Sequence, residues 1–177
     1  MVKLAVYIVL GIALALLQVS FFATLPYLNS LNFILIFLVY LTIKKNDAAL
    51  IFALISGYIL DVYSSYPFGM HILALFAVNF LANYIYFRIL TNHRFFPIIF
   101  LITICIAIYH FLILSSISVL SFLKIYAKTQ VWSGIVIKNI GLEIAYSIFF
   151  ISVIYMIFYI ARKKLNIYLI THRKNYE

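Results

Sequence analysis

Six long apolar runs, separated by short polar breaks, constrain this chain more than any other feature of its sequence. They cover residues 4–22, 28–43, 48–62, 71–87, 95–119 and 140–160. A helix needs about 20 apolar residues to cross the ~30 Å hydrocarbon core of a bilayer, and a shorter helix is tolerated where neighbouring helices supply partners for its polar groups. We therefore expect an all-α integral membrane protein with six transmembrane helices.

The composition excludes a water-soluble or disordered chain. Hydrophobic residues make up 67% of the 177 residues and charged residues only 10%, whereas soluble domains are about 45–50% apolar and about 25% charged. The length suits a single transmembrane domain over residues 1–177,. Cys105, the one cysteine, lies in an apolar run, so neither a disulfide framework nor a cysteine metal site is expected.

The basic residues predict the orientation of the helices. If the N-terminus is cytoplasmic, only Lys124, Lys128 and Lys138 lie on the outer side. The other ten lie on the cytoplasmic side, namely Lys3, Lys44, Lys45, Arg88, Arg94, Arg162, Lys163, Lys164, Arg173 and Lys174. Basic loops stay in the cytoplasm, so both termini are expected there. Residues 161–177 form a basic tail, which either continues the last helix or lies on anionic lipid headgroups. Because the charges stand between the apolar runs, we expect no nucleic-acid partner.

Each apolar run carries a polar side chain at a similar depth. A rise of about 1.5 Å per residue from the cytoplasmic charges places all of them in the outer third of the membrane: Gln18, Asn32, Asp61, His71, His110 and Glu143. Two interpretations have equal weight, namely tolerated polar residues near an interface and a functional polar layer. An unpaired Asp costs about 2.5–3.5 kcal/mol at mid-membrane. We therefore expect Asp61 to face the bundle, with His71, Asn32 or solvent at the loop as a partner, and to anchor the loop that follows.

Catalytic motifs are missing from the sequence. It contains neither HExxH nor GxSxG, and no glycine-rich phosphate loop precedes a helix,. We expect no enzymatic activity, no metal site and no cofactor.

The segment from Gly57 to His71 carries the most specific pattern. It follows the basic turn at Lys44 and Lys45 and fits G-x-x-x-D-x-x-S-G-x-P-x-G-x-H, except that Ser65 stands where Gly is usual. This pattern resembles that of the rod shape-determining protein MreD family. Six residues match it in register: Gly57, Asp61, Ser64, Pro67, Gly69 and His71.

The resemblance implies a non-enzymatic, multi-pass scaffold subunit of the bacterial elongation machinery in the inner (cytoplasmic) membrane. It implies MreC as a partner, with links to the MreB filament and to the cell-wall synthases that make peptidoglycan. It also implies a bundle similar to the substrate-binding subunits of energy-coupling-factor vitamin transporters. The competing interpretation is such a transporter subunit, with the polar layer as its pocket. The sequence leaves open a homodimer, the helix that faces the partner, and whether the polar layer binds membrane lipids or another ligand.

The motif residues also suggest a local structure. Pro67 and Gly69 predict a tight re-entry into the next helix, because Pro restricts φ and Gly permits a positive φ. Ser64 can bond backbone groups left open at a helix end. Asp61 and His71 bracket this loop, so a carboxylate–imidazole contact would close it. We favour this clamp over a recognition surface, and we include Asn32 and Gly57 among the structural or partner-binding candidates.

Overall fold

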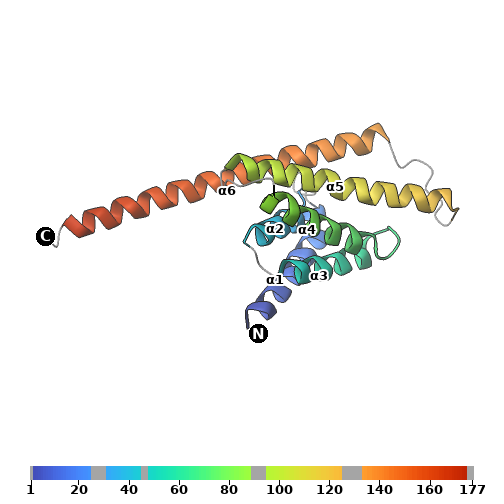
Figure 1. Ribbon diagram of the computed structural model, residues 1–177, viewed down its shortest axis with the longest axis horizontal. Helices are drawn as coiled ribbons and strands as arrows, with labels where there is room; N and C mark the ends of the chain where they lie inside the picture. The colour runs from blue at the N-terminus through green and yellow to red at the C-terminus, as the bar shows by residue number, and fades with distance from the viewer. Residues whose placement is uncertain (1, 25–30, 45–47, 89–94, 125–132, 175–177) are drawn as a thin grey trace.

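The computed structural model of the chain describes residues 2–24, 31–44, 48–88, 95–124 and 133–174. These ranges contain six α-helices and one short 3-10 helix (Figure 1). In chain order they are α1 (Val2–Ser20), η1 (Phe22–Thr24), α2 (Phe33–Ile43), α3 (Ala48–Tyr63), α4 (Met70–Arg88), α5 (Phe95–Phe122) and α6 (Gly134–Lys174). The prediction of an all-helical chain with six helices is confirmed.

Three of the six helices are long and apolar enough to cross a membrane within the described residues. These spans are Met70–Arg88 in α4, Pro97–Phe122 in α5 and Gly134–Val153 in α6. The apolar parts of α1, α2 and α3 are shorter, and α2 has only 11 residues. At the ends of these helices, the first N–H groups and the last C=O groups have no partner within the helix and need one elsewhere.

The last helix differs most from its prediction. It begins at Gly134 rather than at residue 140, and it continues without a break to Lys174. Of the two arrangements open to the basic tail, the structure has the continuation of the last helix, because residues 161–174 extend α6. Neither Gly nor Pro occurs between residues 142 and 174, so nothing in this stretch interrupts a helix. At about 1.5 Å per residue, the 41 residues of α6 far exceed the thickness of a bilayer core.

The second helix also begins later than predicted. The run predicted from residue 28 becomes a helix only at Phe33, after Asn32 in the N-cap position. The polar breaks expected at residues 45–47 and 89–94 lie outside the described residues, as do residues 125–132 of the expected outer loop.

The helices form two layers (Figure 1). α5 and α6 run as a long hairpin along one side of the bundle formed by α1 to α4, and the C-terminal half of α6 projects beyond it. α3 packs against both α1 and α4, while α4 also packs against α2 and α5. The best-packed part of the molecule is therefore α1 to α5, with α6 attached through α5.

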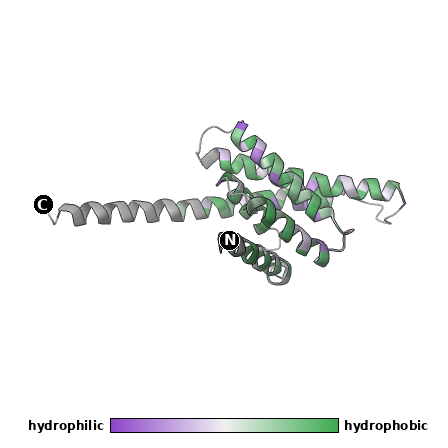
Figure 2. Cartoon of the chain, turned by 60° about the horizontal axis from the view of Figure 1, so that its bottom comes forward, coloured by the Kyte–Doolittle hydropathy of each residue, from purple (hydrophilic) through white to green (hydrophobic). Residues whose placement is uncertain are grey.

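The core is apolar and lies where these helices meet. It includes Leu35 of α2, Phe52 of α3, Leu75 of α4 and Leu101 of α5, all fully buried. Large apolar side chains also cover the outside, and Figure 2 shows hydrophobic residues along every helix in the parts it colours. Exposed apolar faces of this extent are typical of helices that contact lipid.

Small residues bring α1 close to α3. Ala15 is fully buried, and a Cβ atom added to Gly11 would lie 3.1 Å from Cδ2 of Phe52. A larger side chain at Gly11 would therefore push against a ring in the core.

Gly11→Ile is expected to lower stability by about 1–3 kcal/mol, the usual cost of overpacking a core. The thermal unfolding midpoint of the purified protein in detergent measures this effect. Ala13→Ile is the matched control, because Ala13 lies exposed on the same helix. Equal midpoints for the two variants would contradict the close packing of α1 on α3.

Candidate functional site

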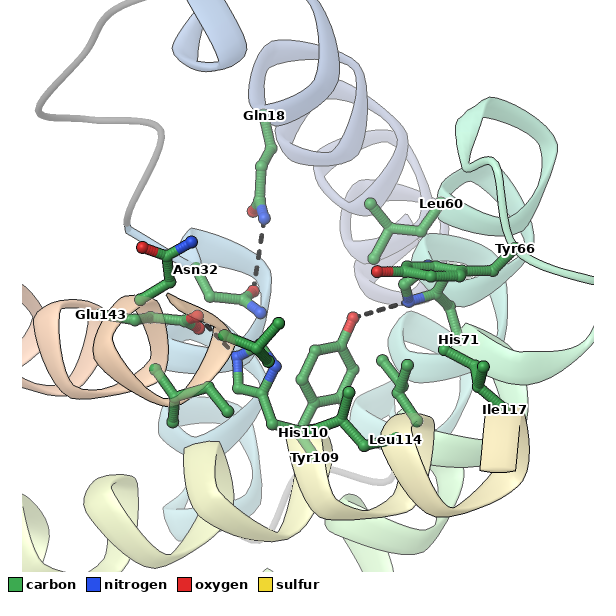
Figure 3. Close-up of a pocket in the computed structure, with 14 residues that line it drawn as sticks. Gln18, Asn32, Leu60, Tyr66, His71, Tyr109, His110, Leu114, Ile117 and Glu143 are labelled. Carbon is green, nitrogen blue, oxygen red and sulfur yellow. Dashed lines mark hydrogen bonds and ion pairs between the residues drawn. The ribbon is translucent and has the colours of Figure 1, made fainter. Parts of the chain in front are cut away.

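Five of the six predicted polar residues line one cavity of about 370 Å³ (Figure 3). They come from five helices or helix starts: Gln18, Asn32, His71, His110 and Glu143. Asp61, the sixth, is not in its lining, although it is buried. The residues predicted to lie at a similar depth, except Asp61, thus share one cavity.

Gln18 and Asn32 complete the N-terminus of α2. Oδ1 of Asn32 accepts the backbone N–H of Leu35 at 3.1 Å, and Oε1 of Gln18 accepts that of Ile34 at 3.1 Å. Nε2 of Gln18 also donates to Oδ1 of Asn32 at 3.4 Å. The first turn of a helix has backbone N–H groups without intrahelical partners. A side chain of α1 therefore helps to cap α2.

Asp61 performs the same task for α4. Its Oδ1 accepts the backbone N–H of His71 at 2.8 Å, and its Oδ2 accepts that of Ile72 at 3.1 Å. The carboxylate comes from the last turn of α3 and is only 4% exposed. A negative charge at a helix N-terminus is also favoured by the helix dipole.

The structure places Asp61 against the bundle, at the start of the helix that follows the loop. The carboxylate–imidazole contact suggested by the sequence is nevertheless wrong, because Asp61 bonds the backbone of His71 and not its ring. Asn32, the other suggested partner, caps α2 instead.

The loop between α3 and α4 explains why the capping side chain comes from another helix. Gly69 has a φ of +98°, in the left-handed region that favours glycine,. Its carbonyl accepts the first bond of α4, from the N–H of Leu73 at 3.0 Å. Since glycine at this position offers no side-chain acceptor, Asp61 supplies it.

Ser64 and Pro67 lie at the other end of this loop. The N–H of Ser64 bonds to the carbonyl of Leu60, and its Oγ donates to the carbonyl of Asp61 at 3.3 Å. The same Oγ accepts the N–H of Tyr66 at 3.3 Å. Ser64 thus bonds backbone groups at the end of α3, and the half-buried Pro67 restricts the chain between Tyr66 and Gly69,.

Gly57 allows α3 to approach the first turn of α4. A Cβ atom at this position would lie 2.7 Å from Cα of Ile72 and 3.2 Å from the carbonyl oxygen of His71. Residues four apart share a helix face, so Gly57 and Asp61 meet the same turn. The G-x-x-x-D spacing therefore combines close backbone packing with an amide cap.

The His71 side chain pairs with a residue that the sequence did not single out. Nδ1 of His71 lies 2.7 Å from Oη of Tyr109, and both residues are buried. The Tyr66 ring lies beside His71, with ring centroids 5.7 Å apart. In the sequence, the only feature that pointed to Tyr109 as a site residue is its position next to His110. This is weak evidence in a chain with 15 tyrosines.

His110 and Glu143 connect α5 to α6. Nε2 of His110 lies 2.6 Å from Oε2 of Glu143. The second carboxylate oxygen of Glu143 is buried without a hydrogen-bond partner. This pair is a polar contact between α5 and α6 at the cavity (Figure 3).

The chemistry of the site is that of hydrogen bonding and helix capping. Among the residues that the structure describes, no three His, Cys, Asp or Glu side chains form a group that could hold a metal ion. Most polar side chains of the cavity bond to groups of the chain itself.

Comparison with known proteins gives one family. A profile of the family described as rod shape-determining protein MreD matches residues 1–164. No curated protein and no solved structure matches the chain.

Asp61→Ala is expected to destabilise the protein strongly. It leaves two amide N–H groups of α4 without their acceptor, and each buried unpaired group costs about 1–3 kcal/mol. Asp61→Asn, which keeps one carbonyl oxygen, should fall between Ala and the original residue. Membrane abundance and the thermal midpoint measure the effect, and Asn83→Ala, an exposed amide on α4, is the control. Normal abundance and stability of Asp61→Ala would contradict the cap.

Gly57→Ala should destabilise by about 1–3 kcal/mol, because the new Cβ meets backbone rather than a movable side chain,. Gly141→Ala is a matched control, since nothing lies within 4 Å of a Cβ there. In that open helical position alanine should be neutral or stabilising by up to about 1 kcal/mol. Thermal unfolding in one detergent compares the two, and the same sign for both changes would argue against the close approach of α3 and α4.

Proposed function

Because the chain belongs to the MreD family of rod shape-determining proteins, we propose that it is a non-enzymatic membrane scaffold of the cell-elongation machinery. In this proposal it binds MreC and, through MreC, the MreB filament and the cell-wall synthases, and so helps to organise peptidoglycan synthesis. The single observation that carries the proposal is the family match over residues 1–164.

The geometry of the polar residues supports a scaffold. Gln18, Asn32 and Asp61 bond to helix N-termini, and His71 bonds to Tyr109. These contacts join α1 to α2, α3 to α4, and α4 to α5. A chain whose buried polar groups hold its own helices together presents a rigid surface to a partner helix, and such contacts rely on packing and interhelical hydrogen bonds.

The vitamin-transporter alternative is less well supported. A ligand pocket needs polar groups free to fix the ligand, but Gln18, Asn32 and His71 in the cavity have partners within the chain. We propose that the six helices are arranged as in the substrate-binding subunits of these transporters, without the vitamin-binding function.

The placement in the membrane is part of the same proposal. We propose one multi-pass domain in the bacterial inner membrane, with all six helices in the bilayer and both termini in the cytoplasm. The support is the distribution of Lys and Arg, because only three of the 13 lie on the outer side in this orientation,.

Affinity purification of the full chain from membranes of its rod-shaped host tests the function. We expect it to recover MreC, a single-span partner with a periplasmic domain, and depletion of the protein should produce round cells. Recovery of an ATPase pair with tight vitamin binding, or normal cell shape after depletion, would contradict the scaffold. The same purification, with a second tag on half of the copies, tests the homodimer.

A further inference from the structure

The end of the α5–α6 hairpin carries charges that the proposed orientation does not explain. Lys124 and Lys138 are both exposed, and together with Lys128, which lies outside the described residues, they are the basic residues of the outer side. Basic residues on that side oppose the rule that sets the orientation. The two acids among the described residues, Asp61 and Glu143, accept hydrogen bonds elsewhere in the fold. The charge at this end therefore has no acidic partner within the described chain.

Lys124 follows α5 in a backbone conformation that favours glycine. Its φ is +58°, and no other non-glycine residue in the described part of the chain has a positive φ. Its N–H bonds to the carbonyl of Ser121 at 3.0 Å, at the end of the helix. A side chain at a positive φ carries a steric cost that glycine avoids. A residue held at such a cost is a reason to look for a function of its side chain.

Large apolar side chains precede this lysine. Phe122 is 87% exposed, and Leu123 is exposed as well. At the start of α6, Ile135 and Ile137 are also exposed. Lysine places its carbon chain along apolar surface and its ammonium group in a polar layer. Apolar side chains combined with lysine are typical of a segment that lies at the boundary between acyl chains and head groups.

The length of α5 places its end at that boundary. The apolar part, Pro97–Phe122, has 26 residues, which span ~39 Å at about 1.5 Å per residue. The hydrocarbon core is ~30 Å thick, or ~40–45 Å with both head-group layers. At the average helix tilt of about 20°, a span of this length that starts at one edge of the core ends ~7 Å beyond the other edge. Figure 1 shows this end of α5 beyond the loop between α3 and α4. Lys124 therefore lies at the depth of lipid phosphates.

We propose that the end of α5 binds the head group of an anionic phospholipid. The ammonium group of Lys124 contacts the phosphate, while Phe122 and Leu123 contact the adjoining acyl chains. Lysine binds phosphate as a point charge, and a lysine near an anionic membrane surface is attracted to it. An acidic protein surface would match the charge but not the exposed apolar side chains at this depth. The proposal goes beyond the scaffold function and uses only the proposed placement of the helices in the bilayer.

Photo-cross-linking from position 122 tests the proposal. Phe122 is replaced by the photo-cross-linker p-benzoylphenylalanine in the full chain, which is reconstituted into nanodiscs with equal amounts of phosphatidylglycerol and phosphatidylcholine. Intact mass spectrometry after irradiation identifies the lipid adducts. We expect phosphatidylglycerol adducts to exceed phosphatidylcholine adducts about fivefold, the effect of one lysine near an anionic surface. The same cross-linker at Phe80, which is 70% exposed on α4, is the matched control and should show no preference.

Three substitutions at position 124 separate the charge from the fold. Lys124→Gly and Lys124→Asn remove the charge, and both residues accept a positive φ, so each should keep the thermal midpoint and reduce the adduct ratio to near one. Lys124→Arg keeps the charge and should keep the ratio. An unchanged ratio in folded Lys124→Gly or Lys124→Asn overturns the proposal. Equal adducts of the two lipids in the unsubstituted chain also overturn it.

Irradiation in native membranes distinguishes a lipid from a protein at this surface. We expect adducts of anionic phospholipid at position 122, and a protein adduct in place of lipid overturns the proposal. Recovery of MreC by affinity purification is a separate measurement. The scaffold function can therefore fail while the lipid preference holds, and the reverse result is equally distinguishable.

Discussion

The need to pair backbone amides at helix starts that lie inside an apolar bundle is the constraint on which this structure depends. The first N–H groups of each helix have no carbonyl acceptor in an earlier turn, and a buried N–H group without an acceptor is costly. The chain answers with side chains from the preceding helix: Gln18 of α1 bonds at the start of α2, and Asp61 of α3 bonds at the start of α4. Capping thus becomes a tertiary contact that aligns neighbouring helices.

The local geometry around α4 follows from that constraint. A positive φ at Gly69 turns the chain sharply into the helix but leaves the cap position without a side chain. Asp61 can substitute only if α3 comes close, and the missing Cβ of Gly57 allows this, since a Cβ would lie 2.7 Å from Cα of Ile72. The three residues therefore depend on one another, and their fixed spacing in the sequence is a consequence of one helix packing on the first turn of the next.

Much of this could be predicted from the sequence, and what failed has definite physical causes. The six apolar runs predicted six helices. Each run is recognised from the residue types of its own segment, without knowledge of its tertiary contacts. Counting residues along each helix also brought together five polar residues that line one cavity, since the helical rise is constant. The partner of Asp61 was not, because a carboxylate accepts equally well from a ring or from backbone N–H groups, and the choice depends on where the α4 backbone lies. The sequence left open whether the basic tail extends α6 to Lys174, because hydropathy marks the end of an apolar run and not the end of a helix.

The sequence alone therefore determined that this chain is helical and apolar, which polar residues lie within its apolar runs, and the family to which its motif points. These properties follow from composition and from spacing along one chain, and neither depends on how the helices meet. Only the tertiary structure decided that His71 pairs with Tyr109, that five of the polar residues surround one cavity, and that an oxygen of Glu143 has no partner. Hydrogen bonds act over about 3 Å between atoms distant in sequence, so the partners are specified only when the helices are packed.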